Sequence, residues 1–169
     1  MSTLLHKKKV PRNIRLAVVS VSTTRGIAED KSGIWMKKEI KKEGHETVVH
    51  HVVTDEVNAI QEMVNHVVDD VGPHVLLMSG GTGLSPRDVT VEAVSPLFDK
   101  ELTAFGPLFA QLSFEQIDSA AIMSRATAGI IRNTIVFCMP GSLNACKLAC
   151  QSLIFPELGH LVKHLSEAP

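Results

Sequence analysis

Residues 75–93 read Val-Leu-Leu-Met-Ser-Gly-Gly-Thr-Gly-Leu-Ser-Pro-Arg-Asp-Val-Thr-Val-Glu-Ala. The apolar run 75–78 predicts a short, fully buried strand, which is typical of the centre of a parallel sheet. The run stops at Ser79, and three glycines follow within four residues. Because glycine lacks a Cβ atom, such a loop turns sharply and brings backbone N–H groups close to an anion. This stretch therefore predicts a central strand that leads into a glycine-rich loop, which either binds an anion or serves only as a structural turn.

Two strand–helix units precede that loop. Residues 15–21 and 47–53 are rich in β-branched and apolar side chains and predict strands. Residues 31–43 predict a helix capped by Asp30, and residues 57–68 predict another because most of their apolar side chains recur every three or four positions. The resulting β-α-β-α-β order predicts the α/β fold class, with three α/β/α layers built on a mostly parallel, doubly wound sheet in a single domain.

Polar segments follow the three predicted strands. Ser22 follows the first strand, Asp55 lies just past the second, and the glycine-rich loop 80–83 follows the third. In doubly wound sheets, ligands bind at the carboxyl ends of the strands. We therefore expect these three segments to meet at one edge of the sheet and to form a binding site.

The second half of the chain has a less regular pattern. A helix interrupted by a proline, a strand and two further helices are predicted at 90–98, 134–139, 144–154 and 157–165. Between the first of these helices and the strand lies an apolar stripe at helical spacing, which indicates either core packing or a contact between subunits. The stripe consists of Phe105, Leu108, Phe109 and Leu112.

The composition limits the possible classes of function. The chain has 169 residues, of which 44% are hydrophobic, and this suits one domain with a full core. Its net charge of −1, from 17 basic and 18 acidic residues, argues against a nucleic-acid partner, which requires an excess of basic side chains. No apolar run approaches the length of about 18 residues that a membrane-spanning helix needs, so no membrane partner is expected.

The first 12 residues are polar and basic and lack the apolar segment of a secretory signal. We interpret residues 1–12 as a flexible arm and residues 13–169 as the domain. A chain of this kind is expected in the cytoplasm.

Cysteine and histidine spacing allows metal sites but favours simpler roles. Cys146 and Cys150 are four apart on a predicted helix, and we interpret them as small buried hydrophobic residues in a reducing cytosol. His160 and His164 are also four apart, with Glu157 nearby, and could hold a metal if all three shared one helix face. A glycine among them weakens that helix, so solvated or capping roles are the default interpretation.

Two aspartates are candidates for phosphate chemistry. Asp88 follows the glycine-rich loop, and Asp55 follows the second strand. Either could cap the helix that begins after it. Together they could instead hold Mg²⁺ with the phosphates of a nucleotide, because hard cations prefer carboxylate oxygen. The loop matches neither the P-loop pattern nor the dinucleotide-binding fingerprint, so the residues alone leave both alternatives open.

Two other segments carry groups that suit anions. Pro140, Gly141 and Ser142 lie between a strand and a helix, where helix N–H groups can face an anion, although a plain turn is the alternative. Ser124 and Arg125 offer a hydroxyl and a cation suited to bidentate phosphate contact, with a surface ion pair as the alternative.

The ordered set of these motifs resembles the MoaB/MogA family of molybdenum-cofactor biosynthesis proteins, and its MoaB branch in particular. Each motif alone is common, whereas their order over nearly the whole chain after the arm is specific. The family's Ser-Asp-Thr after the first strand reads Ser22-Thr23-Thr24 here. The matching residues are 17–25, 30–33, 80–83, 87–90, 92–93, 100–101, 105–106, 124–126, 129, 139–142 and 156–160.

The resemblance implies a reaction and a site. The family is similar to the G-domains of gephyrin-type proteins, and the implied reaction is the Mg²⁺- and ATP-dependent adenylylation of molybdopterin with release of pyrophosphate, before insertion of molybdenum or tungsten. The family's two catalytic aspartates correspond to Asp55 and Asp88, which would also hold the Mg²⁺. The residues expected to contact the pterin or the phosphates are Ser22, Gly80, Gly81, Thr82, Gly83, Glu101, Ser124, Arg125, Pro140, Gly141 and Ser142.

The resemblance also implies partners. Molybdopterin and ATP would be the ligands, and the chain would form a homo-oligomer, either a trimer or a hexamer. The metal-insertion protein of the same pathway would be a further partner. The alternative function is a non-catalytic molybdopterin carrier or assembly protein that uses the same pocket, and the presence of Asp55 favours the enzyme.

Overall fold

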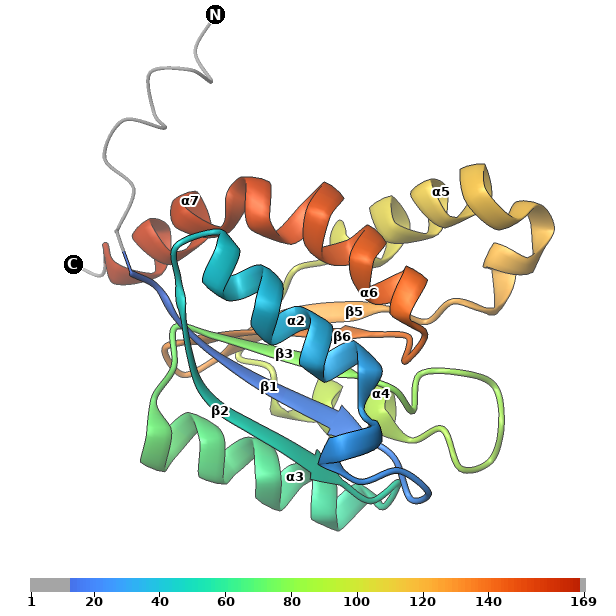
Figure 1. Cartoon of the computed structure of the whole chain (residues 1–169), viewed down its shortest axis with the longest axis horizontal. Coiled ribbons are helices and arrows are strands. Elements are labelled where there is room, and N and C mark those ends of the chain that lie inside the picture. The colour runs from blue at the N-terminus through green and yellow to red at the C-terminus, as the bar shows by residue number, and fades with distance from the viewer. Residues whose placement is uncertain (1–12, 168–169) are drawn as a thin grey trace, which may run out of the picture.

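The computed structural model describes residues 13–167, in which a six-stranded sheet lies between two layers of helices (Figure 1). The predicted arm, residues 1–12, lies outside the described residues. The strands are β1 (Arg15–Val21), β2 (Glu46–Val53), β3 (Val75–Ser79), β4 (Lys100–Glu101), β5 (Thr127–Ile131) and β6 (Thr134–Met139). The α-helices are α2 (Lys31–Lys42), α3 (Val57–His66), α4 (Thr90–Val94), α5 (Phe105–Ile117), α6 (Leu143–Ala149) and α7 (Phe155–Ser166).

Shorter helical segments extend or connect these elements. The 3-10 segments are Ile27–Glu29, Ser95–Leu97 and Asp118–Met123, and the π-helical segments are Val67–Val71 and Cys150–Ile154. The π-helical segments continue α3 and lead from α6 into α7, so the apolar patterns at 57–68 and 144–154 belong to nearly continuous helical stretches.

The strand order is β2-β1-β3-β6-β5-β4. The first four of these strands are parallel to one another, whereas β5 is antiparallel to both β6 and β4. This confirms the predicted fold class of one α/β domain with a mostly parallel sheet. The chain leaves β1 towards β2 and returns on the other side to β3, so the strand order reverses between β1 and β3. Such a reversal is where ligands bind in doubly wound sheets.

Alternating side chains of the sheet divide the core into two layers. On β1, Leu16 and Val18 pack with α2, α5, α6 and α7, whereas Ala17 and Val19 pack with α3 and α4. Because both faces of the central strands are covered, β1 and β3 consist almost wholly of buried residues. No helix within residues 13–167 has both the length and the apolar character needed to cross a membrane.

The apolar stripe on α5 divides between two environments. Phe105 and Phe109 are 6% and 1% exposed and belong to the core, whereas Leu108 is 47% exposed. The stripe was predicted to serve either core packing or a subunit contact. At the two phenylalanines, the structure shows core packing. It leaves Leu108 on an outer surface of the monomer.

Candidate functional site

A cavity of about 490 Å³ opens at the carboxyl ends of β1, β2 and β3, beside the point where the strand order reverses. Four loops line it, and they include most of the residues predicted from the sequence. The loop after β3 projects from this end of the sheet in Figure 1. The lining residues are Val21, Ser22, Thr23, Thr24, Arg25, Asp55, Gly80, Gly81, Thr82, Gly83, Ser85, Arg87, Asp88, Met123, Pro140, Gly141 and Ser142.

The glycine-rich loop needs its glycines for close packing. Gly80 and Gly81 have φ angles of +96° and +66°, in the region that side chains rarely adopt. A Cβ atom on Gly80 would lie 2.4 Å from the Val21 carbonyl oxygen, and one on Gly81 would lie 2.3 Å from Oγ1 of Thr90. The first turn of α4 holds the loop, because the hydroxyl and the N–H of Thr90 donate to the Gly80 and Gly81 carbonyls at 2.8 and 2.9 Å.

These bonds use the carbonyl groups of the loop and leave its amides available. Within residues 13–167, no hydrogen bond engages the backbone N–H groups of Gly81, Thr82 or Gly83. Consecutive N–H groups of this kind form an anion-binding concavity. The structure is therefore compatible with the anion-binding role predicted for this loop.

Asp88 does not cap the helix that follows it. The N-cap position of α4 is Val89, and no side chain caps the helix there. Oδ2 of Asp88 instead accepts the Ser85 N–H at 2.9 Å, within its own loop. A Cβ atom on Gly83 would lie 2.8 Å from the same oxygen, so the glycine makes room for the carboxylate. The capping alternative for Asp88 is therefore wrong.

Asp55 does not act as a cap either. The N-cap position of α3 is Glu56, again without a side-chain cap. Oδ2 of Asp55 accepts the N–H of Thr23 at 2.8 Å and its hydroxyl at 2.7 Å. Across the described part of the chain, Oδ1 of Asp55 and Oδ1 of Asp88 take part in no hydrogen bond or ion pair. Each aspartate thus has one anchored oxygen and one oxygen left for a ligand.

Two lining arginines were not assigned a role from the sequence. Arg25 follows β1 in the Ser-Thr-Thr-Arg segment, and Arg87 directly precedes Asp88. Neither guanidinium forms an ion pair or a hydrogen bond with another residue of 13–167. Guanidinium groups bind phosphate in bidentate geometry, so both suit an anionic ligand. Their position after a strand end, shared with Ser22 and Asp88, is the pattern that could have identified them.

The predicted residues Ser124 and Arg125 lie beside the cavity and do not line it. Arg125 pairs with Glu92 and donates to the backbone oxygens of Thr82 and Asp88 at 3.1 and 3.2 Å. The hydrogen bonds from Arg125 lower the pKa of the Glu92 carboxyl. Arg125 therefore forms the ion pair that was one of its two predicted roles, and it also stabilises the glycine-rich loop. Its contact with phosphate stays a prediction.

The loop after β6, which consists of Pro140, Gly141 and Ser142, forms another wall of the cavity. The hydroxyl of Ser142 accepts the Ala145 N–H at 3.2 Å and caps α6. Glu101, in contrast, lies on β4 and lines a separate, mostly apolar groove with α5 and α7. The single chain therefore does not bring Glu101 to the other predicted site residues.

The remaining candidates for metal binding do not form a site. The three cysteines are buried and unpaired, and burial raises the pKa of Cys138 to about 12 and that of Cys146 to about 11. His160 and His164 share one face of α7, with Nε2 atoms 2.8 Å apart. No group of three or more histidine, cysteine or acidic side chains is placed to hold a metal within 13–167.

Comparisons with known proteins identify relatives that match nearly the whole chain. The model of a family described as a probable molybdopterin binding domain matches residues 16–160. The molybdenum cofactor biosynthesis protein B of Bacillus subtilis is 47% identical over 166 residues, which cover 98% of each chain. A probable molybdopterin adenylyltransferase of Methanocaldococcus jannaschii is 38% identical over 170 residues, covering 96% of this chain and 99% of the relative.

The fold agrees as well. A crystal structure of a molybdenum cofactor biosynthesis protein B superposes with a TM-score of 0.91 at 42% identity, covering 95% of this chain and 100% of the other. Sequence and fold thus point to one family. The chain belongs to the MoaB/MogA family of molybdenum-cofactor biosynthesis proteins, on its MoaB branch.

Proposed function

We propose that the protein is a molybdopterin adenylyltransferase, which transfers AMP from ATP to the terminal phosphate of molybdopterin and releases pyrophosphate. The observation that carries this proposal is the pair of aspartates, Asp55 and Asp88, which line one cavity from two different strand ends, each with one anchored and one unengaged oxygen. The name of the Methanocaldococcus jannaschii relative supports the same reaction.

The donor set in the cavity fits Mg²⁺. Both candidate ligands are carboxylate oxygens, which hard cations prefer, and Mg²⁺ in nucleotide sites is usually held by one or two carboxylates together with substrate phosphates and water. Among residues 13–167, no third histidine, cysteine or acidic side chain is placed with the two aspartates to hold a metal, which matches that pattern. Asp55 and Asp88 would hold the ion, which when bound would supply positive charge to neutralise the phosphates.

The chain's own residues would then position the two substrates. In the transfer, an oxygen of the molybdopterin phosphate attacks the α-phosphorus of ATP, the bond from that phosphorus to the bridging oxygen breaks, and pyrophosphate leaves with its electron pair. The amides of Gly81, Thr82 and Gly83 would hold one phosphate group. Arg25 and Arg87 would offset the charge of the departing pyrophosphate, which is the kind of electrostatic stabilisation that dominates phosphoryl transfer.

The direct test is incubation of the protein with molybdopterin and ATP, with and without Mg²⁺, followed by an assay for pyrophosphate. We expect pyrophosphate release that requires all three components, with adenylylated molybdopterin as the second product. Binding of molybdopterin without any release of pyrophosphate would contradict the proposal and favour the carrier function.

A further inference from the structure

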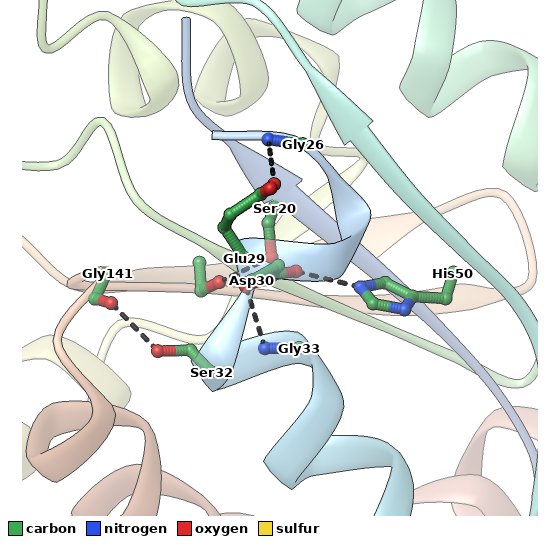
Figure 2. Close-up of polar contacts among 9 residues, drawn as sticks. Ser20, Gly26, Glu29, Asp30, Ser32, Gly33, His50 and Gly141 are labelled. Carbon is green, nitrogen blue, oxygen red and sulfur yellow. Dashed lines mark hydrogen bonds and ion pairs between the residues drawn. The ribbon is translucent and has the colours of Figure 1, made fainter. Parts of the chain in front are cut away.

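A buried polar network lies behind the wall of the cavity (Figure 2). Its centre is a contact between Nε2 of His50, on β2, and Oδ2 of Asp30, at the start of α2, with a distance of 2.8 Å. The two side chains are 5% and 8% exposed. Burying a histidine and a carboxylate together is costly unless their hydrogen bonds are made, so this contact is a feature that needs a reason.

The pair holds the first turn of α2. Oδ1 of Asp30 accepts the Gly33 N–H at 2.9 Å and thereby caps the helix. A Cβ atom on Gly33 would lie 2.1 Å from Oδ2 of Asp30 and 2.4 Å from Nε2 of His50. The start of the helix therefore rests directly on the histidine–carboxylate contact, and only glycine allows this close approach.

The same turn of α2 is tied to the cavity wall. The hydroxyl of Ser32 donates to the Gly141 carbonyl at 2.9 Å, across 109 positions in the chain, as Figure 2 shows. A Cβ atom on Gly141 would lie 3.0 Å from Cα of Gly80, so the segment 140–142 packs against the glycine-rich loop. A continuous set of contacts thus runs from His50 through Asp30 and Ser32 to the two backbone segments proposed to bind phosphate.

Two observations separate this network from ordinary core packing. Nδ1 of His50 is buried, and no atom of the described chain is its hydrogen-bond partner. An apolar side chain would avoid the cost of that orphaned atom. Burial raises the pKa of Asp30, but hydrogen bonds from Ser20, the Gly33 N–H and His50 outweigh it, so the pKa of Asp30 lies below its ordinary value.

We infer that His50 is a positioning residue for the phosphate-binding wall, and that it acts through Asp30 and Ser32 on Gly141. The inference rests on the proposed function, and it adds that segment 140–142 holds nucleotide phosphate together with the glycine-rich loop. His50 touches no substrate in this account. Its role is to keep the first turn of α2 at the position from which Ser32 reaches the Gly141 carbonyl.

The test measures binding of MgATP and of pyrophosphate by isothermal titration to four single variants and one double variant. His50→Phe removes the bond to Asp30, His50→Gln keeps an N–H donor, and Ser32→Ala removes only the hydroxyl bonded to Gly141. His51→Phe is the matched control, since the next residue on β2 faces the opposite side of the sheet, where its ring lies near that of His66. Thermal unfolding establishes that each variant is folded.

We expect His50→Phe and Ser32→Ala each to weaken binding of both ligands by about five- to tenfold, the range of one lost hydrogen bond. His50→Gln should stay within about twofold of the wild type, and so should His51→Phe. The double variant of His50→Phe and Ser32→Ala should bind no more weakly than about the worse single variant, because both changes break the same connection. A structural role alone would make their effects additive.

Amide hydrogen exchange supplies a readout that needs no ligand. His50→Phe should speed exchange at residues 143–146, at the start of α6, whereas His51→Phe should not.

Unchanged affinity and exchange in His50→Phe and Ser32→Ala would overturn the inference while leaving the proposed function intact. A wild-type protein that binds neither MgATP nor pyrophosphate would overturn both. If His50→Phe fails to fold, Ser32→Ala decides the outcome on the same measurements.

Discussion

Thr23 donates both its backbone N–H and its hydroxyl to one oxygen of Asp55, at 2.8 and 2.7 Å. The N–H of Asp55 in turn donates to the Thr23 hydroxyl at 3.3 Å. These bonds join the loop after β1 to the loop after β2, and the two that reach the carboxylate both end on its Oδ2. Oδ1 is therefore left for a ligand, and Thr23 fixes the orientation of a residue that we propose to be catalytic.

Replacing Thr23 by valine should weaken this anchor without unfolding the protein. The side chain keeps nearly the same shape and the backbone N–H remains, so only the two hydrogen bonds of the hydroxyl are lost. We expect adenylyl transfer to fall by about five- to tenfold, within the range of one typical net hydrogen bond at an exposed site. Thr54→Val is the control, because Thr54 directly precedes Asp55 in the chain and is exposed. Equal activity in both variants would show that Thr23 does not position the carboxylate.

Asp55→Asn should affect the nucleotide more than the pterin. The change keeps an acceptor oxygen for Thr23 but removes the negative charge that a cation requires. Separate isothermal titrations with MgATP and with molybdopterin would measure each affinity. We expect weaker binding of MgATP, by about tenfold, and nearly unchanged binding of molybdopterin. The reverse pattern would mean that Asp55 serves the pterin.

Two partly buried histidines predict a loss of stability in mild acid. Nδ1 of His74 accepts the Arg15 N–H at 3.0 Å, and burial, together with the nearby Arg15 charge, lowers the pKa of His74. Burial likewise lowers the pKa of His45. Below the ordinary value of 6.5 the unfolded chain therefore binds these protons more readily than the folded chain, so the free energy of unfolding falls as the pH drops through that range.

Denaturant unfolding at pH 7.5 and at pH 5.5 measures this effect. The wild type should lose more stability between the two values than His74→Asn, whose amide oxygen can still accept the Arg15 N–H. His45 is present in both proteins and contributes equally. The same loss in both proteins would contradict the role assigned to His74.

The exposed apolar residues of α5 and the turn after it predict self-association. Leu108, Phe114, Ile117 and Ile122 are 47%, 57%, 54% and 88% exposed, which is unusual for side chains of this kind in a monomer. Light scattering at micromolar concentration should give a mass at least three times that of the 18.3 kDa chain. A folded wild-type monomer would contradict this.

The variant Ile117→Asp with Ile122→Asp should lower that mass by placing charge in the contact. Ile27→Asp is the control, because Ile27 is also about half exposed, at 51%, but lies elsewhere, in the turn before α2. If the two variants behave alike, the surface of α5 is not the contact between subunits.

The sequence predicts the first half of the fold well for a local reason. The strand 15–21 and the helix after Asp30 have patterns that their own residues complete, and the structure confirms both. β4 and β5 were not predicted, because β4 has two residues and β5 contains small ones. Gly129 of β5 is needed where the Phe98 ring packs against the backbone, a constraint that arises only from tertiary structure.

The limits are similar at the candidate site. Asp55 and Asp88 each precede a helix, so local sequence allows a capping role. The structure excludes that role for Asp55, because its carboxylate is hydrogen-bonded to Thr23, 32 positions away, and not to the start of the helix. Arg125 likewise finds Glu92 at a separation of 33 positions. Partners this distant in the chain cannot be read from spacing.

The most direct measurement is the turnover of Asp88→Asn with molybdopterin and MgATP, with pyrophosphate release as the readout. Asparagine can still accept the Ser85 N–H, so the loop should keep its shape and the protein its thermal stability. We predict that transfer falls by about 100-fold, or about 3 kcal/mol, because the charge proposed to hold Mg²⁺ and orient the phosphates is gone. A folded Asp88→Asn protein that releases pyrophosphate at nearly the wild-type rate would contradict the catalytic assignment.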